Sequence, residues 1–290
     1  MNGKYEINTK ENREFLKASC EELLNFGHRF PSPNGGSYYL GDDGIPWKDR
    51  NRETWITCRM AHVYSLGLML GHEGSGELVD AALKGLRGEL HDEKNGGWYA
   101  GVTQEGGIVP NKQCYAHAFV ILAASSALTA GRPGAKELLE EALAVYDRHF
   151  WNEEEGLACD TWNTEFTVLD DYRGLNANMH TVEAFLAAGD VTGDKKYHIR
   201  AGRIIDHVIQ WAEDNSWRIP EHFTKEWVAD LDCNRDRPDD PFKPYGATPG
   251  HGIEWARLIT QWTLANCGEE KEKQEYKKLK TNNIRTSRES

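Results

Sequence analysis

The sequence predicts an all-α protein, an α/α toroid in which helical hairpins follow one another around a ring. Four segments have apolar residues at three- and four-residue spacing and are rich in small side chains. They are 54–70, 113–128, 178–189 and 252–265. Apolar and small residues on several sides of a helix suit burial among neighbouring helices. We therefore expect these four segments to be the inner helices of the ring.

More polar helices alternate with the buried ones. Each has one apolar stripe and one charged face, as expected of an outer helix; they are 13–27, 76–90, 135–150 and 195–214. Polar landmarks mark the starts of the inner helices: Arg59, His117, His180 and His251. Their spacing of roughly 60 residues, made of two helices and a loop, indicates a repeat architecture. Two of the loops, 90–102 and 150–162, have an acidic turn with glycine and read as β-hairpins.

The helical pattern stops near residue 266. A ring of six hairpins needs twelve helices, whereas eight are predicted here. Either the ring is smaller, or the chain is truncated or altered at its C-terminus. We expect the second, in which residues 1–266 form a single α/α-barrel domain that is C-terminally incomplete and marginally stable or aggregation-prone. Residues 267–290 are highly charged and have few apolar residues, so they are predicted to be a disordered tail.

Charge and composition narrow the class of protein. The chain has 46 acidic and 34 basic residues and a net charge of −12, which disfavours nucleic acid or an anionic membrane as partner. No apolar run is long enough to span a membrane, and the N-terminus does not resemble a signal peptide. The six cysteines are scattered without a CxxC pair, as expected of buried thiols in a reducing compartment. We expect a cytoplasmic protein, and the sequence indicates no oligomeric state.

If every inner helix begins at the same end of the ring, the four polar landmarks lie together at one opening of the ring. Helix N-termini carry partial positive charge and free N–H groups, which suit oxygen-rich or transiently anionic ligands. The loops add aromatic residues: Tyr38, Tyr39, Trp47, Trp98, Trp162, Tyr172 and Tyr245. An aromatic bowl with polar edges suits a sugar, whose C–H faces stack on rings while its hydroxyls need hydrogen bonds.

A histidine precedes a glutamate by three residues in two inner helices, as His180/Glu183 and His251/Glu254. This spacing places both side chains on one helix face, where the carboxylate can orient the imidazole. A histidine that titrates near neutral pH is suited to moving a proton to and from carbon. The alternative is that each histidine is a satisfied core or capping group.

Metal binding and glycoside hydrolysis are the two alternatives to proton transfer. A metal site would need further glutamate ligands from facing helices, and no HExxH motif is present, so we do not expect a catalytic metal. Glycoside hydrolysis needs two carboxylates, for which Asp170 and Asp171 are candidates. Loop hydrogen bonding, or an ion pair with Arg173, is the interpretation we prefer for them.

The segments TWITCRMAHVYSLG, KQCYAHAFVILAASSA, DDYRGLNANMHTVEAFLAAGDVTGD and YGATPGHGIEWARL resemble the N-acylglucosamine 2-epimerase family. Within it they are closest to the aldose–ketose isomerases of mannose or sulfoquinovose. The resemblance covers roughly residues 15–265. It implies an (α/α)6 barrel and a cofactor-free, metal-independent reaction on an open-chain sugar, in which a C2 proton is removed and an enediol forms.

The resemblance also assigns roles to residues. Arg59 would stabilise the enediolate, His251 would transfer protons, and His180 would hold a hydroxyl or assist ring opening. Substrate contacts would come from Trp55, Tyr115, Asn176 and Glu254, and wall positions from His117 and Gln113. The family's second acid/base histidine would lie beyond the segment that shows the resemblance, so we expect activity of this chain to be impaired. A sugar 2-epimerase, a catalytically inactive sugar-binding module and a helical scaffold without ligand remain alternatives.

Overall fold

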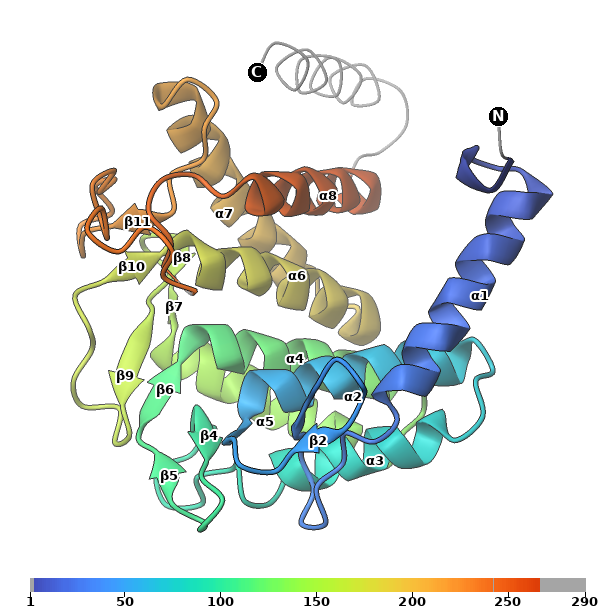
Figure 1. The fold of residues 1–290 in the computed structure, drawn as a ribbon. Helices are drawn as coiled ribbons and strands as arrows, with labels where there is room; N and C mark the ends of the chain where they lie inside the picture. Colours follow the sequence, from blue (N-terminus) through green and yellow to red (C-terminus); the bar gives the residue numbers. More distant parts are fainter. Residues whose placement is uncertain (1–2, 242, 267–290) are drawn as a thin grey trace. The chain divides into compact units, whose positions relative to one another are not determined.

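The structure, a computed structural model of the 290-residue chain, describes residues 3–241 and 243–266. This part of the chain contains eight α-helices joined by short strands (Figure 1). The chain divides into two compact units: Met1–Tyr146 with Trp162–Val168, and Asp147–Thr161 with Leu169–Ser290. Each unit is described by itself below.

The first unit is built on two consecutive helical hairpins. Its helices are η1 (Gly3–Tyr5), α1 (Lys10–Gly27), α2 (Thr54–Met69), α3 (Ser75–Leu86), α4 (Cys114–Thr129) and α5 (Ala135–His149), whose last turn belongs to the second unit. Its strands are β1 (Tyr39–Leu40), β2 (Pro46–Trp47), β3 (Arg52–Glu53), β4 (Gly101–Val102), β5 (Ile108–Val109) and β6 (Asn111–Gln113). β1 pairs antiparallel with β2, and β3, β4 and β5 form a three-stranded antiparallel sheet.

Helices α2 and α4 form the centre of this unit, and α3 packs against α2 (Figure 1). Nearly every residue of α4 is buried, because its sequence is apolar or small on all sides. In α2 the buried residues include Cys58, Ala61 and Tyr64, and Tyr64 donates a hydrogen bond to the carbonyl of Leu24 in α1 at 2.7 Å. Burial of α4 agrees with the inner position predicted for 113–128. In α2, predicted as the inner helix 54–70, seven residues are buried, while Val63, Leu66 and Met69 are exposed.

The two hairpins of this unit repeat the same turn. Gly71 and Gly74 join α2 to α3, and Gly131 and Gly134 join α4 to α5. All four have positive φ, between 70° and 83°, a left-handed conformation that glycine adopts without strain. The repeated turn supports the internal repeat that the sequence predicts.

The second unit contains α6 (Leu175–Thr192), α7 (Lys195–Asp214) and α8 (Pro249–Asn266), which all pack against one another. Its strands are β7 (Trp151–Asn152), β8 (Leu157–Ala158), β10 (Arg173–Gly174) and β11 (His222–Phe223), while β9 (Thr161–Asn163) lies at the boundary between the units. β7 pairs with β8 and β10 with β11, both antiparallel. Most of α6 is buried, whereas α7 has one buried stripe and α8 buries only three residues.

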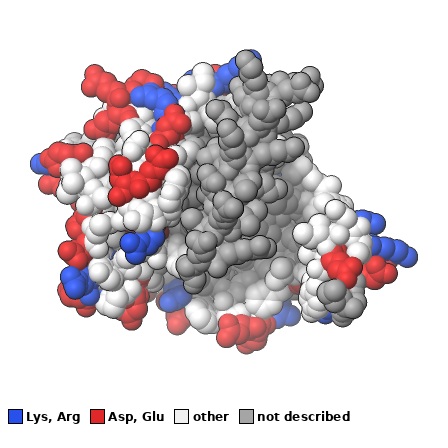
Figure 2. All heavy atoms as spheres, turned by 90° about the horizontal axis from the view of Figure 1, so that it is seen from above, with Lys and Arg blue, Asp and Glu red and all other residues white. Residues whose placement is uncertain are grey.

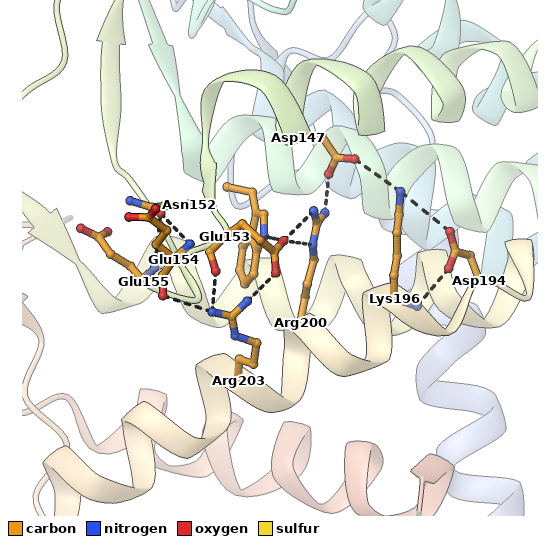
Figure 3. Close-up of polar contacts among 10 residues, drawn as sticks. Asp147, Asn152, Glu153, Glu154, Glu155, Asp194, Lys196, Arg200 and Arg203 are labelled. Carbon is orange, nitrogen blue, oxygen red and sulfur yellow. Dashed lines mark hydrogen bonds and ion pairs between the residues drawn. The ribbon is translucent and has the colours of Figure 1, made fainter.

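A polar cluster ties α7 to the β7–β8 hairpin (Figure 3). Glu153 accepts hydrogen bonds from Arg200 at 3.0 Å, from Arg203 at 2.5 Å and from the indole of Trp151 at 2.6 Å. Asp147 at the end of α5 accepts a hydrogen bond from Arg200 at 2.5 Å and pairs with Lys196 at 3.4 Å. The close-up shows these side chains in one row along the first half of α7.

The sequence-based expectations for the fold hold in most respects. All eight predicted helices are present, and 150–162 contains the β7–β8 hairpin. In the other predicted hairpin, 90–102, a single bridge between His91 and Trp98 closes the turn. Residues 101–102 form β4, which pairs with β3 and β5, and Lys112 donates hydrogen bonds to Asp92 and to the Gly96 carbonyl inside the turn.

The other expectations concern the cysteines, membrane spans, surface charge and domain bounds. The five described cysteines are free, with Cys58 and Cys114 buried. None of the described helices combines the length and the apolar character needed to cross a bilayer. On the face drawn in Figure 2, acidic side chains gather in several groups with basic ones among them. The predicted disordered tail, 267–290, lies outside the described residues, and the single-domain interpretation of 1–266 stays a prediction.

Candidate functional site

In the first unit, Arg59 presents an exposed guanidinium beside a wall of aromatic rings. It lies in the second turn of α2, and its Nη2 donates to the hydroxyl of Tyr115 at 3.2 Å. The guanidinium carbon is 5.3 Å from the ring centroid of Trp55 and 4.7 Å from that of Phe119. Cation–π contacts on two rings hold the guanidinium in a defined orientation. Arg59, Trp55 and Tyr115, predicted separately, thus come together.

Glu53 organises the same wall from the start of α2. Its Oε2 accepts hydrogen bonds from the Tyr39 hydroxyl at 2.6 Å and from the Trp55 indole. Burial, together with the hydrogen bond to Glu53, raises the pKa of Tyr39, so this phenol stays protonated as a donor. One carboxylate therefore fixes two aromatic side chains next to Arg59.

His117 has a different setting. It is almost completely buried, its Nδ1 lies 2.7 Å from the carbonyl oxygen of Gln113, and its Nε2 accepts the backbone N–H of Trp98 at 3.1 Å. This geometry requires a neutral ring that carries its proton on Nδ1. His117 thus holds the 92–98 turn onto the start of α4, and Gln113 contributes to this contact through its backbone.

In the second unit, His180 is paired as the sequence predicts. Its Nδ1 lies 3.1 Å from Oε2 of Glu183, one turn further along α6. Arg257 of α8 donates to the other carboxylate oxygen at 2.6 Å. Burial by itself would raise the pKa of Glu183, but the hydrogen bonds and charges of His180 and Arg257 outweigh it and lower the pKa to about 2.

Asn176, one turn before His180 on the same helix, has an unsatisfied acceptor. Within the described part of the chain, its Oδ1 is buried and has no hydrogen-bond partner. A buried oxygen without a partner is costly, and such atoms in native proteins point to a bound water or ligand. Asn176 is therefore suited to accept a hydrogen bond from a ligand hydroxyl.

His251 lies in the first turn of α8, and its carboxylate partner is Glu221 rather than Glu254. Nδ1 of His251 is 3.0 and 2.9 Å from the two carboxylate oxygens of Glu221. The hydrogen bond to Glu221 raises the pKa of His251; burial opposes this, and the charges of Glu221 and Glu254 add to it. The HxxE interpretation is thus correct for His180, whereas at His251 Glu254 contributes only its charge.

Glu221, the carboxylate partner of His251, was not identified from the sequence. Its side chain is only 5% exposed and also accepts the backbone N–H of Thr248 at 3.2 Å. The neighbouring His222 is buried between the Tyr172 hydroxyl, 2.7 Å from Nδ1, and the carbonyl of Pro244, 2.8 Å from Nε2. Both residues precede or begin the short strand β11, where neither helical periodicity nor a motif marks them.

The remaining candidates are the Asp170 carboxylate and a possible metal site. The Asp170 carboxylate accepts the backbone N–H of Tyr172 at 2.9 Å, and Arg173 donates to the backbone carbonyls of Asp170 and Tyr172. Loop hydrogen bonding, the interpretation preferred from the sequence, is therefore confirmed for Asp170. Across the described residues, no group of three or more His, Cys, Asp or Glu side chains is arranged to hold a metal ion.

The chain is a helical-hairpin protein of the α/α-barrel type, because successive α/α hairpins follow one another with short β pairs in their loops. Near the amino ends of three of the helices lie Arg59, His180 and His251. The profile of the N-acylglucosamine 2-epimerase (GlcNAc 2-epimerase) family matches residues 35–287. The chain belongs to this family, which confirms the resemblance seen in the sequence.

Two curated relatives of similar sequence are D-mannose isomerases. The chain is 43% identical over 249 residues to a D-mannose isomerase of Thermobifida fusca and 39% identical over 254 residues to one of Pseudomonas cannabina pv. alisalensis. These alignments cover 85% and 87% of this chain but 61% of each relative, so the chain spans about three fifths of their length.

Solved structures agree with the fold. A crystal structure of D-mannose isomerase matches with a TM-score of 0.81 at 29% identity, over 90% of this chain and 67% of that one. Cellobiose 2-epimerase from Bacillus thermoamylovorans matches with a TM-score of 0.76 at 20% identity, over 91% and 70% of the two chains. The second match supports the fold alone.

Proposed function

We propose that this protein is an aldose–ketose isomerase of a hexose, of the mannose–fructose type. The proposal combines the similarity to D-mannose isomerases with one structural observation that carries the chemistry. His251 is a partly exposed imidazole whose Nδ1 is held by the buried carboxylate of Glu221. Within the described part of the chain, its Nε2 has no hydrogen-bond partner, which suits proton transfer to and from a ligand.

The proposed reaction moves a hydrogen from C2 to C1 of the open-chain sugar. His251 removes the C2 proton, the electron pair forms the C1–C2 double bond of an enediol, and the C1 carbonyl oxygen takes a proton. Return of a proton to C1, with loss of the O2 proton, gives the ketose. Negative charge develops on the oxygens in the transition state, where a fixed cation lowers the barrier.

Each unit supplies groups of the kind this reaction needs. In the first, Arg59 carries the charge that would stabilise the enediolate, and Trp55 and Tyr115 form the wall beside it. In the second, Asn176 offers an unsatisfied acceptor for a hydroxyl, and His180, whose Nδ1 lies beside Glu183, would assist ring opening. Glu254 belongs to the proposed substrate contacts, whereas the observed bonds of His117 and Gln113 favour a structural role.

Incubation of the chain with D-mannose in D2O, followed by NMR, tests the proposal. We expect fructose that carries deuterium at C1, and we expect His251→Asn to abolish it. Glucose with deuterium at C2 would instead identify a 2-epimerase. Because the chain spans three fifths of its relatives, a fusion to the remaining part of the T. fusca enzyme is assayed in parallel. Sugar binding without deuterium incorporation in both proteins would support the inactive binding module and contradict the isomerase.

Glu213→Gln is the matched control for these assays. Glu213 lies on α7 and is exposed, so its replacement shows the effect of a substitution outside the proposed site. Its fructose production should equal that of the unmodified chain.

We place the protein in the cytoplasm as part of the same proposal, because its described cysteines are free and scattered along the chain.

A further inference from the structure

We propose that Glu221 is a positioning residue for His251, fixing the tautomer and orientation of the imidazole through its two carboxylate oxygens. This inference deepens the proposed isomerase function and rests on it for the catalytic consequence. The contact itself is a statement about the folded chain and is tested separately. No sequence motif pairs these residues, which are 30 positions apart.

The geometry of the contact defines one protonation pattern. Both oxygens of Glu221 lie within 3.0 Å of Nδ1, so this nitrogen carries a proton and donates it. In the neutral imidazole, the lone pair is then on Nε2, the atom that can accept a proton from carbon. A carboxylate that orients a catalytic histidine in this way also stabilises the imidazolium that forms.

Glu221 is itself held in place on three sides. The Thr248 backbone N–H, immediately before α8, donates to Oε1 at 3.2 Å. The Glu221 carbonyl accepts the N–H of Leu175, the first residue of α6, at 3.0 Å. The next residue, His222, pairs with Gly174 in the β10–β11 ladder. Glu221 therefore connects the starts of the two helices that carry His180 and His251.

Among the described residues, two carboxylates act on His251, and they differ in kind. Glu221 acts through a hydrogen bond and through charge, whereas Glu254 acts through charge alone. The Glu221 carboxylate also lies at the N-terminus of α8, where the helix dipole favours a negative charge. The buried Glu221 therefore both orients the His251 imidazole and places a negative charge beside it.

The test compares Glu221→Gln with Glu254→Gln by NMR titration of 15N-labelled His251. The glutamine amide in place of Glu221 still accepts the Thr248 N–H, so the fold is expected to persist while the charge is lost. We expect the pKa of His251 to fall in both variants, and further in Glu221→Gln. We also expect the 15N shifts of the neutral ring to show the Nδ1–H form in the unmodified chain and a mixture of tautomers in Glu221→Gln.

A catalytic readout in the active protein, the chain or its fusion, completes the test. The kcat of Glu221→Gln should fall by about 10- to 100-fold, because general acid–base catalysis contributes about 10²–10⁴-fold and the base itself remains. KM should change little, and the acidic limb of the kcat–pH profile should move to lower pH together with the pKa of His251.

Two results would overturn the inference. An unchanged pKa and tautomer of His251 in a folded Glu221→Gln variant would show that Glu221 only caps α8. An equal fall in pKa in both variants would show that charge, and not the hydrogen bond, dominates. Neither result depends on activity. Failure of the isomerase proposal, seen as absence of fructose from the unmodified proteins, can therefore be distinguished from failure of the Glu221 inference.

Discussion

His180 and Arg257 bind opposite oxygens of the same carboxylate, that of Glu183, at 3.1 and 2.6 Å. His180 and Glu183 belong to α6 and Arg257 to α8, so the contact joins two helices of the second unit. The Glu183 side chain is 19% exposed, and its pKa is lowered from 4.5 to about 2 by contacts that outweigh its burial. A carboxylate with a lowered pKa in the folded state makes stability depend on acid.

The first prediction follows from this pKa. The stabilisation from ionised Glu183 is fully present above about pH 4.5 and is lost as pH falls toward 2. The free energy of unfolding of Glu183→Gln should therefore be lower than that of the unmodified chain at pH 6, and the difference should shrink at pH 3. Urea denaturation at both pH values measures it. A difference that is the same at both would show that Glu183 does not titrate with the fold.

The second prediction concerns Arg59. Arg59→Met should lower kcat/KM for mannose by about 10²–10³-fold, the usual effect of removing one donor that stabilises an oxyanion. Arg59→Lys should fall between, because lysine keeps the charge but not the planar, two-pronged geometry. The side chain is exposed, so thermal denaturation of both variants should match that of the unmodified chain. Activity of Arg59→Met within twofold of the unmodified protein would remove Arg59 from the proposed mechanism.

The third prediction concerns the unsatisfied oxygen of Asn176. Asn176→Leu replaces a buried acceptor that lacks a partner with an apolar group of similar size. Stability should stay equal or increase, while KM for the sugar should rise, because the hydrogen bond to a substrate hydroxyl is lost. Calorimetry and initial-rate kinetics on the same samples check the two effects. A large loss of stability would mean that the oxygen is paired within the fold.

The fourth prediction concerns a buried ion pair in the first unit. Lys112 donates to Asp92 at 2.8 Å, and neither side chain is exposed. Lys112→Met should lower the free energy of unfolding by about 3–5 kcal/mol, because it leaves a buried carboxylate without its cation. Asp92→Asn in the same chain should recover part of the loss.

Lys136→Met is the control for this prediction. Lys136 pairs with Glu140 on α5, and both side chains are more than 60% exposed. Its removal should change stability by no more than about 0.5 kcal/mol. Equal effects at both lysines in urea denaturation would contradict the role given to burial.

The fifth prediction concerns the cluster around Glu153 (Figure 3). Glu153→Ala should lower the free energy of unfolding by about 1 kcal/mol, because the pairs with Arg200 and Arg203 are partly exposed. The loss should become smaller at about 1 M NaCl, where charges are screened within a few ångströms. Glu213 is exposed and has no such partners among the described residues, so Glu213→Ala should show neither effect.

Helix positions followed closely from the sequence because they depend on local periodicity. Segment 54–70 was expected and α2 spans Thr54–Met69; segment 195–214 was expected and α7 spans Lys195–Asp214. Three helices, α1, α8 and α6, begin three residues before the predicted start; α6 begins at Leu175 rather than 178. Its first turn is anchored by the carbonyl of Glu221, a contact with a residue more than 40 positions away, so no local pattern indicates it.

For the site, the residue types were predictable and their partners were not. The sequence by itself determined which helices carry Arg59, His180 and His251, and that His180 faces Glu183, because residues three apart on a helix are neighbours whatever surrounds them. Only the tertiary structure decided that His251 pairs with Glu221, that Glu53 orients Tyr39 and Trp55, and that both nitrogens of His117 are used inside the fold. These contacts join a helix start to a loop or strand distant in sequence, and such a distance is set by packing, which no periodicity of the chain encodes.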